Sequence, residues 1–226
     1  MYLIIVGAGD IGMPLISLAT SDGHEVVVVE DDEDTADAAA RAFDCLVLNA
    51  DATTAETLEE AGAERADAII STTDADATNV MVMLLADDLG VPSRVSVVHD
   101  EEHMSLFRRI GANTIENPQQ LIAEYLYRAV QRPSIKDVLH LAGDAEIFEI
   151  TVTDDAPLAG LSLAEADEAG LLGDEGLLVV AIERGETVVT PRGDTEIAAG
   201  DLVTVFSKRG YSPDVIERFA PESATV

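Results

Sequence analysis

YLIIVGAGDIGMPLISLATSDGHEVVVVEDD, residues 2–32, holds two β-branched runs separated by a glycine-rich turn and a helical pattern. Gly7, Gly9 and Gly12 have the G-x-G-x-x-G spacing, which allows a tight turn, close approach of the backbone to a pyrophosphate, and close packing of a helix on a strand. Glu30 ends the second run 18 residues after Gly12, near the roughly 20 expected for a ribose-binding acid. The stretch therefore predicts the first βαβ unit of a dinucleotide-binding fold.

Short β-branched runs continue to alternate with helical patterns up to residue 116. Strands separated by helix-length segments predict right-handed crossovers and a mostly parallel sheet that is covered by helices on both faces. Thr53 and Glu56 have capping-box spacing, and Gly62 and Gly111 stand where helices are expected to end. The predicted fold class is α/β, with a Rossmann-like, doubly wound parallel sheet.

The pattern changes after this sheet. NPQQLIAEYLYRAV, residues 117–130, predicts a helix with Asn117 as its N-cap and an apolar stripe. This helix packs either on its own domain or, as a crossover helix, on a second subunit. Strands joined by turns then predict a smaller α+β domain. We expect a nucleotide-binding domain at 1–131 that includes the crossover helix, a linker at 132–137 and a second domain at 138–226.

The predicted pocket lies at the carboxyl ends of the parallel strands, at the switch point of the sheet. The first helix offers free N–H groups and its positive dipole end to phosphates. NADAT (49–53) and STTDADATN (71–79) follow the third and fourth strands, and the second stretch is also compatible with a helix cap. The residues expected at the ligand are Gly7, Ala8, Gly9, Asp10, Ile11, Gly12, Glu30, Asp31, Asp51, Ala52, Thr72, Thr73, Asp74 and Asn79.

The acidic end of the second strand predicts the kind of nucleotide. A carboxylate at Glu30 accepts hydrogen bonds from ribose hydroxyls and repels a 2′-phosphate. Asp31 and Asp32 strengthen this repulsion. We therefore expect NAD(H) or ADP/ATP, and not NADP; the alternative is a Rossmann-like domain with a degenerate, empty site.

Composition excludes several classes of function. The chain has 13 Lys and Arg against 44 Asp and Glu, a net charge of −31, so it lacks the basic footprint that nucleic acid needs. No apolar stretch approaches the roughly 20 residues of a membrane span, and the one cysteine cannot form an internal disulfide. We expect a cytoplasmic protein. Dispersed acids with almost no lysine favour a salt-loaded, haloarchaeal cytoplasm over a metal-binding surface, which would need ligand-like spacing.

Residues for chemistry on a bound nucleotide are not apparent in the sequence. The four histidines have no evident triad partner, and there is no G-x-S-x-G motif, P-loop lysine or metal-ligand spacing. The second domain is also small for the substrate half of a dehydrogenase. We therefore predict a sensor with no catalytic residues and no metal site. An NAD-dependent oxidoreductase with an unrecognised substrate site is the alternative.

Several segments together resemble a known family: IIVGAGDIG, VVVVEDD, LEEAGAERADAIISTTDADATNVM, LFRRIGANTIENPQQLIAEYLYRAV, PLAGLSLAEA and VAIERGETVVTPRGDTEIAAGDLVTVFS. They resemble TrkA-type regulators of potassium transport, in which an RCK (regulator of K⁺ conductance) N-domain precedes a TrkA-C domain. The resemblance covers nearly the whole chain. It implies a cytoplasmic regulatory subunit, held at the inner face of the membrane by its partner without inserting into the bilayer itself.

The resemblance also implies partners and a role. The expected partner is a Trk/Ktr-type potassium-transporting membrane protein, gated in response to bound NAD(H) or adenine nucleotide by homodimers assembled into a ring. The helix at 117–130 then becomes the crossover helix of the dimer. A gating-ring module of another K⁺ channel or exchanger is an alternative.

The chain departs from the family that it resembles at three positions. Many relatives carry an arginine-rich strand whose side chains reach phosphates, whereas SVVH (96–99) places Val97 and His99 there. The resemblance makes His99 a further ligand-binding candidate, as a partial and pH-dependent substitute for arginine. Gln119 stands where relatives often have glutamate after the helix proline, so a divalent ion shared at the dimer interface is not expected.

Overall fold

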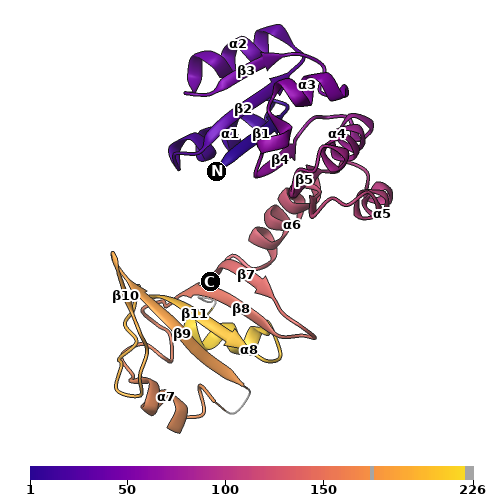
Figure 1. Ribbon diagram of the computed structural model, residues 1–226. Helices are drawn as coiled ribbons and strands as arrows, with labels where there is room; N and C mark the ends of the chain where they lie inside the picture. Colours follow the sequence, from indigo (N-terminus) through magenta and orange to yellow (C-terminus); the bar gives the residue numbers. More distant parts are fainter. Residues whose placement is uncertain (174–175, 222–226) are drawn as a thin grey trace. The chain divides into compact units, whose positions relative to one another are not determined.

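The computed structural model describes residues 1–173 and 176–221. The chain divides into two compact units, Met1–Glu124 and Tyr125–Val226. Figure 1 colours the chain by residue number, from indigo at the N-terminus to yellow at the C-terminus. The end of the predicted second domain at residue 226 lies outside the described residues. The fold class predicted from the sequence is confirmed, and the predicted domain bounds stay a prediction.

The first unit contains a six-stranded parallel sheet in the order β3-β2-β1-β4-β5-β6. This is the order of a doubly wound dinucleotide-binding fold, in which the strand order reverses between β1 and β4. Nearly continuous Val, Ile and Leu runs fit burial on both faces. The strands are β1 Tyr2–Val6, β2 Glu25–Glu30, β3 Leu46–Asn49, β4 Ala68–Ser71, β5 Ser93–Val97 and β6 Thr114–Glu116.

Helices cover both faces of this sheet (Figure 1). Leu3 and Ile5 of β1 belong to a core with residues of the first two helices. Ile4 and Val6 belong to a second core, with residues of the third to fifth helices. The alternation follows from the period-2 geometry of a strand. The helices are α1 Gly12–Ser21, α2 Glu33–Ala42, α3 Ala55–Glu60, α4 Asp76–Asp88 and α5 Met104–Arg109.

The predicted helix ends are largely confirmed. Gly62 and Gly111 follow α3 and α5 and have φ values of +82° and +83°, a left-handed conformation that glycine adopts without strain. The predicted capping box at Thr53 and Glu56 is wrong. Thr54 caps α3 by accepting a hydrogen bond from the N–H of Thr57, whereas the Thr53 hydroxyl donates to Asp51.

Helix α6, Pro118–Gln131, follows β6. As expected, Asn117 caps it, since the Asn117 Oδ1 accepts a hydrogen bond from the N–H of Gln120 at 3.0 Å. None of its side chains is buried. Its exposed large apolar residues are Leu121, Ile122, Tyr125, Leu126, Tyr127 and Val130.

The second unit contains an antiparallel sheet in the order β10-β9-β11-β8-β7. One apolar core, which includes Phe148, Ile182 and Phe219, joins the sheet to two short helices. Ser162 and Ser212 cap these helices. The elements are β7 Ile135–His140, β8 Glu146–Thr151, β9 Leu177–Arg184, β10 Thr187–Val189, β11 Leu202–Ser207, α7 Leu163–Glu168 and α8 Pro213–Phe219.

Strand β7 occupies part of the segment predicted as a linker at 132–137. Ile135 is buried and pairs with Ile150 of β8. The intervening residues carry a register irregularity between Ile135 and Val138, which removes the regular alternation that marks a strand in sequence. The short segment therefore lacks the pattern of a strand, although the β8 backbone pairs with it.

An ion pair between a buried carboxylate and an exposed arginine stabilises the second unit. Asp201 is 1% exposed, and its two carboxylate oxygens accept hydrogen bonds at 2.7 Å from Nε and Nη2 of Arg184. The N–H of Ala198 donates to the same carboxylate at 2.8 Å. The hydrogen bonds from Arg184 lower the pKa of Asp201 below its ordinary value, although burial opposes the shift.

Asp201→Asn is expected to lower the free energy of unfolding by about 2 kcal/mol at pH 7, because it replaces the charged acceptor of three hydrogen bonds at a buried position. A carboxyl with a lowered folded-state pKa contributes stability above its unfolded pKa and loses it as the pH falls through the folded pKa. The difference between the two proteins in urea unfolding should therefore shrink in acid. A difference that stays constant down to about pH 2 would contradict this account.

Candidate functional site

A cavity of about 640 Å³ opens at the carboxyl ends of the strands where the sheet order reverses. Parallel α/β sheets bind ligands at this position. The structure brings most of the predicted residues together at the cavity: Gly7, Gly9, Glu30, Asp31, Asp51, Ala52, Thr72, Thr73 and Asp74.

The three glycines of the motif are present for different physical reasons. Gly7 has a φ of +90°, which strains any residue with a side chain. A Cβ on Gly12 would lie 2.0 Å from the carbonyl oxygen of Gly7, so the first turn of α1 packs directly against the end of β1. A Cβ on Gly9 would meet no protein atom within 4 Å. Nothing in the fold requires glycine at position 9, and the space beside it belongs to the cavity.

Two helices begin at this cavity without a side-chain cap. The N-cap residues are Ile11 for α1 and Ala75 for α4, and neither makes a side-chain capping hydrogen bond. By contrast, α2 and α3 are capped by Asp32 and Thr54. Uncapped N–H groups and the positive end of the helix dipole favour an anion. Ala8, Asp10, Ile11 and Gly12 shape this turn but do not line the cavity.

Glu30 connects the second strand to the glycine turn. Its Oε2 accepts a hydrogen bond from the N–H of Ala8 at 2.6 Å, and its Oε1 accepts one from the N–H of Asp32 at 3.0 Å. A carboxylate has about four acceptor positions, so Glu30 can still accept hydrogen bonds from a ligand. Thr72 fixes the other wall, because its hydroxyl donates within 3.1 Å of the carbonyl oxygens of Val6 and Gly7.

Asn79 does not reach the cavity, although the sequence predicts it at the ligand. It is buried, and its Oδ1 accepts hydrogen bonds from the hydroxyls of Ser71 and Thr73 at 2.6 and 2.7 Å. Its Nδ2 donates to the carbonyl oxygen of Thr73 at 3.0 Å. The first turn of α4 therefore uses Asn79 to hold the loop after β4 in place.

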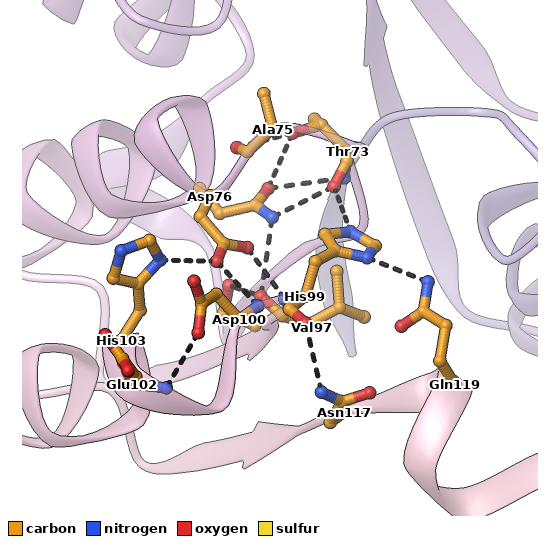
Figure 2. Close-up of polar contacts among 12 residues, drawn as sticks. Thr73, Ala75, Asp76, Val97, His99, Asp100, Glu102, His103, Asn117 and Gln119 are labelled. Atoms are coloured by element: carbon orange, nitrogen blue, oxygen red, sulfur yellow. Dashed lines mark hydrogen bonds and ion pairs between the residues drawn. The ribbon is translucent and has the colours of Figure 1, made fainter. Parts of the chain in front are cut away.

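His99 also does not line the cavity. Its ring lies between Thr73 and Gln119, as Figure 2 shows. A carbonyl oxygen can only accept, so the His99 Nε2–H donates to the Thr73 carbonyl at 3.1 Å, and the Gln119 Nε2 donates to the remaining His99 Nδ1 at 2.9 Å. Both ring nitrogens are thus engaged by protein groups. His99 supports the Thr73 loop from behind rather than replacing a phosphate-binding arginine.

Asp76 organises the loop after β5 (Figure 2). Its carboxylate accepts hydrogen bonds from the N–H groups of His99 and Asp100 at 2.8 and 3.1 Å, and from Nδ1 of His103 at 2.7 Å. Burial raises the pKa of Asp76, but these hydrogen bonds outweigh it and lower the pKa overall. The same contact raises the pKa of His103. This His–Asp pair was not apparent in the sequence, because 27 residues separate its members.

Further residues line the cavity that the sequence did not single out as ligand contacts. Thr35 and Thr78 lie in the first turns of α2 and α4. Asp32 and Ala75 are the N-cap residues of these two helices, and Thr53 directly precedes the N-cap of α3. Their common signal is proximity to a helix N-terminus that follows a parallel strand, where N–H groups converge. Within residues 1–173 and 176–221, no group of His, Cys, Asp and Glu is arranged to hold a metal ion. No helix in the same residues is long and apolar enough to span a bilayer.

Comparisons with known proteins identify both units. Residues 3–118 match the TrkA-N domain and residues 147–220 match the TrkA-C domain. The chain is similar to the Trk system potassium uptake protein TrkA homolog of Methanothermobacter thermautotrophicus, with 28% identity over 97% of this chain and 99% of the relative. That relative and the similar proteins of Pyrococcus abyssi and Azorhizobium caulinodans are named as potassium uptake proteins and not as enzymes.

Solved structures show the same fold. A GsuK channel bound to NAD has a TM-score of 0.69 and 23% identity, and the match covers 98% of this chain and 40% of that one. A GsuK structure bound to ADP has a TM-score of 0.50 and 26% identity over 56% of this chain and 34% of that one. The chain thus spans less than half the length of the GsuK chains. On the family matches, the chain belongs to the TrkA family, with a TrkA-N domain followed by a TrkA-C domain.

Proposed function

We propose that the chain is the cytoplasmic regulatory subunit of a Trk/Ktr-type potassium uptake system and that it gates the membrane subunit in response to bound NAD(H) or adenine nucleotide. The observation that carries the nucleotide part is the open space at Gly9, since no protein atom lies within 4 Å of a Cβ placed there. This space belongs to a cavity at the switch point, next to two uncapped helix N-termini.

The cavity residues divide into two groups for a nucleotide. Glu30 ends β2 and Asp51 lies after β3, and both would accept hydrogen bonds from ribose hydroxyls. Gly7, Gly9 and the Thr72–Thr73 segment border the N-termini of α1 and α4 and would hold the phosphates. GsuK bound to NAD and GsuK bound to ADP support these ligands. Asp31 and Asp32 line the cavity beside Glu30 and would repel a 2′-phosphate, so NADP is excluded from the proposal.

The regulatory part rests on the names of the relatives and on α6. Full-length relatives are named Trk system potassium uptake proteins. The exposed apolar residues of α6 suit a surface that a second copy of the chain covers, so we place the homodimer contact there and expect dimers to assemble into a ring. A nucleotide shifts such an assembly only if it binds one conformation more tightly than the other. Light scattering of the purified protein tests the oligomer.

Thermal unfolding in the presence of NAD⁺, NADH, NADP⁺, ADP and ATP in concentrated KCl tests the nucleotide site. A ligand at 100 times its dissociation constant stabilises the native state by about 2.7 kcal/mol and raises the melting temperature. We expect a rise with every ligand except NADP⁺. NAD⁺ and NADP⁺ differ only by the 2′-phosphate, and ADP carries a net charge similar to that of NADP⁺, so a rise with NAD⁺ and ADP but not with NADP⁺ reports the 2′-phosphate and not the net charge. No rise with any ligand would contradict a nucleotide site, and turnover of NADH would indicate an oxidoreductase.

A further inference from the structure

The cavity walls carry only one sign of charge. Five carboxylates line the cavity, and no lysine, arginine or histidine of the described residues does. A site that holds phosphates by Lys or Arg gains affinity from opposite charges. Here a nucleotide would bring its phosphates into a negative cavity, on a chain whose net charge is −31. The carboxylates are Glu30, Asp31, Asp32, Asp51 and Asp74.

Three of these carboxylates are held in place by hydrogen bonds from backbone N–H groups. Glu30 accepts hydrogen bonds from the N–H groups of Ala8 and Asp32. Asp32 accepts one from the N–H of Thr35, and Asp51 accepts from the N–H and hydroxyl of Thr53 at 2.8 and 2.7 Å. The hydrogen bonds from Thr35 and Thr53 lower the pKa values of Asp32 and Asp51. These three side chains therefore cannot turn away from a bound phosphate without breaking their hydrogen bonds, so the repulsion remains.

The groups available to attract phosphates are neutral. They are the N–H groups of the glycine turn and of the first turns of α1 and α4, which act over short distances. His99, a ligand-binding candidate from the sequence, is hydrogen-bonded to the Thr73 carbonyl and to Gln119 and lies outside the cavity lining. Short-range attraction by neutral donors is thus combined with longer-range repulsion by carboxylates.

We propose that this cavity binds a nucleotide more weakly the more negative charge the nucleotide carries, and that nucleotide affinity therefore rises with KCl concentration. The proposal rests on the nucleotide site proposed above and adds its regulation: occupancy of the site follows the salt content of the cell. The sign is opposite to that of sites built on Lys and Arg, whose affinity for phosphates falls as salt rises. NAD⁺, with about one net negative charge, should be favoured over ATP, with about four.

Isothermal titration of the full chain with NAD⁺ and with magnesium-free ATP, at KCl concentrations from 0.2 to 2 M over which circular dichroism shows the fold unchanged, tests the proposal. The Debye length falls from about 10 Å at 0.1 M to about 3 Å at 1 M. We expect the dissociation constant of ATP to fall about tenfold or more across the series and that of NAD⁺ to change about twofold or less. NaCl should act like KCl, because the mechanism is screening.

Two variants with the same change in net charge separate the cavity from the rest of the molecule. Asp74 lines the cavity, and its side chain makes no hydrogen bond within the part of the chain that the structure describes. Asp74→Asn should strengthen ATP binding severalfold at 0.2 M KCl and flatten the salt dependence. Asp154 is exposed in the second unit, and Asp154→Asn should change neither.

The outcomes are distinguishable. An ATP affinity that falls with KCl, parallel slopes for NAD⁺ and ATP, a rise with KCl but not NaCl, or equal effects of the two variants would each overturn the charge proposal and leave the nucleotide site standing. Absence of binding by every nucleotide at every salt concentration would overturn the site itself, and the charge proposal with it.

Discussion

Replacing Gly12 by alanine is expected to lower the free energy of unfolding by about 3 kcal/mol, at the upper end of the usual cost of overpacking. The added Cβ would lie 2.0 Å from the carbonyl oxygen of Gly7 and 2.8 Å from its carbonyl carbon. These are backbone atoms at the end of β1, so no side-chain rotation relieves the clash. Helix α1 must move away from the sheet, and Ile16 and Ala19, which are buried against Leu3 and Ile5, must move with it.

Urea unfolding at fixed KCl concentration measures this effect. Gly9→Ala is the matched control, because it makes the same chemical change in the same turn at a position where the Cβ meets nothing within 4 Å. We expect the control to unfold within about 0.5 kcal/mol of the wild type. Equal stability of Gly12→Ala and Gly9→Ala would show that α1 does not depend on the close approach to β1.

The sheet was predictable because its central strands β1 and β2 are buried on both faces. Runs such as YLIIV and EVVVVE predict buried β-strands from the local sequence alone. Strand β7 was not predictable, because Ile135 and Val138 are the residues of this edge strand that face the core and the register between them is irregular. Its position depends on β8, which lies in the sequence beyond the intervening turn. Pairing with another strand produces no pattern in the sequence of β7 itself.

Some residues of the candidate site could likewise be predicted from the sequence and others could not. Residues at or directly after the end of a parallel strand, such as Glu30 and Thr72, were predicted because chain order alone places them at the carboxyl edge of the sheet. Asn79 and His99 were misplaced because their direction depends on partners. The hydroxyls of Ser71 and Thr73 direct Asn79 inward, and Gln119 of α6 holds the outer side of the His99 ring. Neither partnership follows from spacing in the sequence.

The actual position of His99 changes the expected chemistry of the site. With His99 at the phosphates, the cavity would contain a group that gains positive charge in mild acid. With His99 bonded to the Thr73 carbonyl, the cavity lining keeps only carboxylates as ionisable groups within the described residues. The repulsion argued for the salt-dependent affinity therefore follows from a contact that only the structure reveals.

The second large effect is expected at Gly9, where alanine should weaken nucleotide binding at least tenfold while leaving the fold intact. The fold tolerates a Cβ at this position, but Gly9 lines the cavity, where a ligand would contact its backbone. A methyl group there separates phosphate oxygens from the N–H groups of the turn, which are the only type of donor that the glycine turn offers. Since the carboxylates of the cavity repel phosphates, no longer-range attraction compensates for the lost contact.

Titration of NAD⁺ into Gly9→Ala, beside the wild type at the same high KCl concentration, measures the change. The melting temperature without nucleotide should equal that of the wild type, and the rise with nucleotide should be lost at ligand concentrations near the wild-type dissociation constant. Gly193→Ala serves as a second control, because its Cβ meets only the Ala164 side chain, at an ordinary contact distance of 3.7 Å, in the other unit. Unchanged NAD⁺ affinity in Gly9→Ala would mean that the ligand does not approach the glycine turn, so the phosphates would have to lie at the N-terminus of α4 alone.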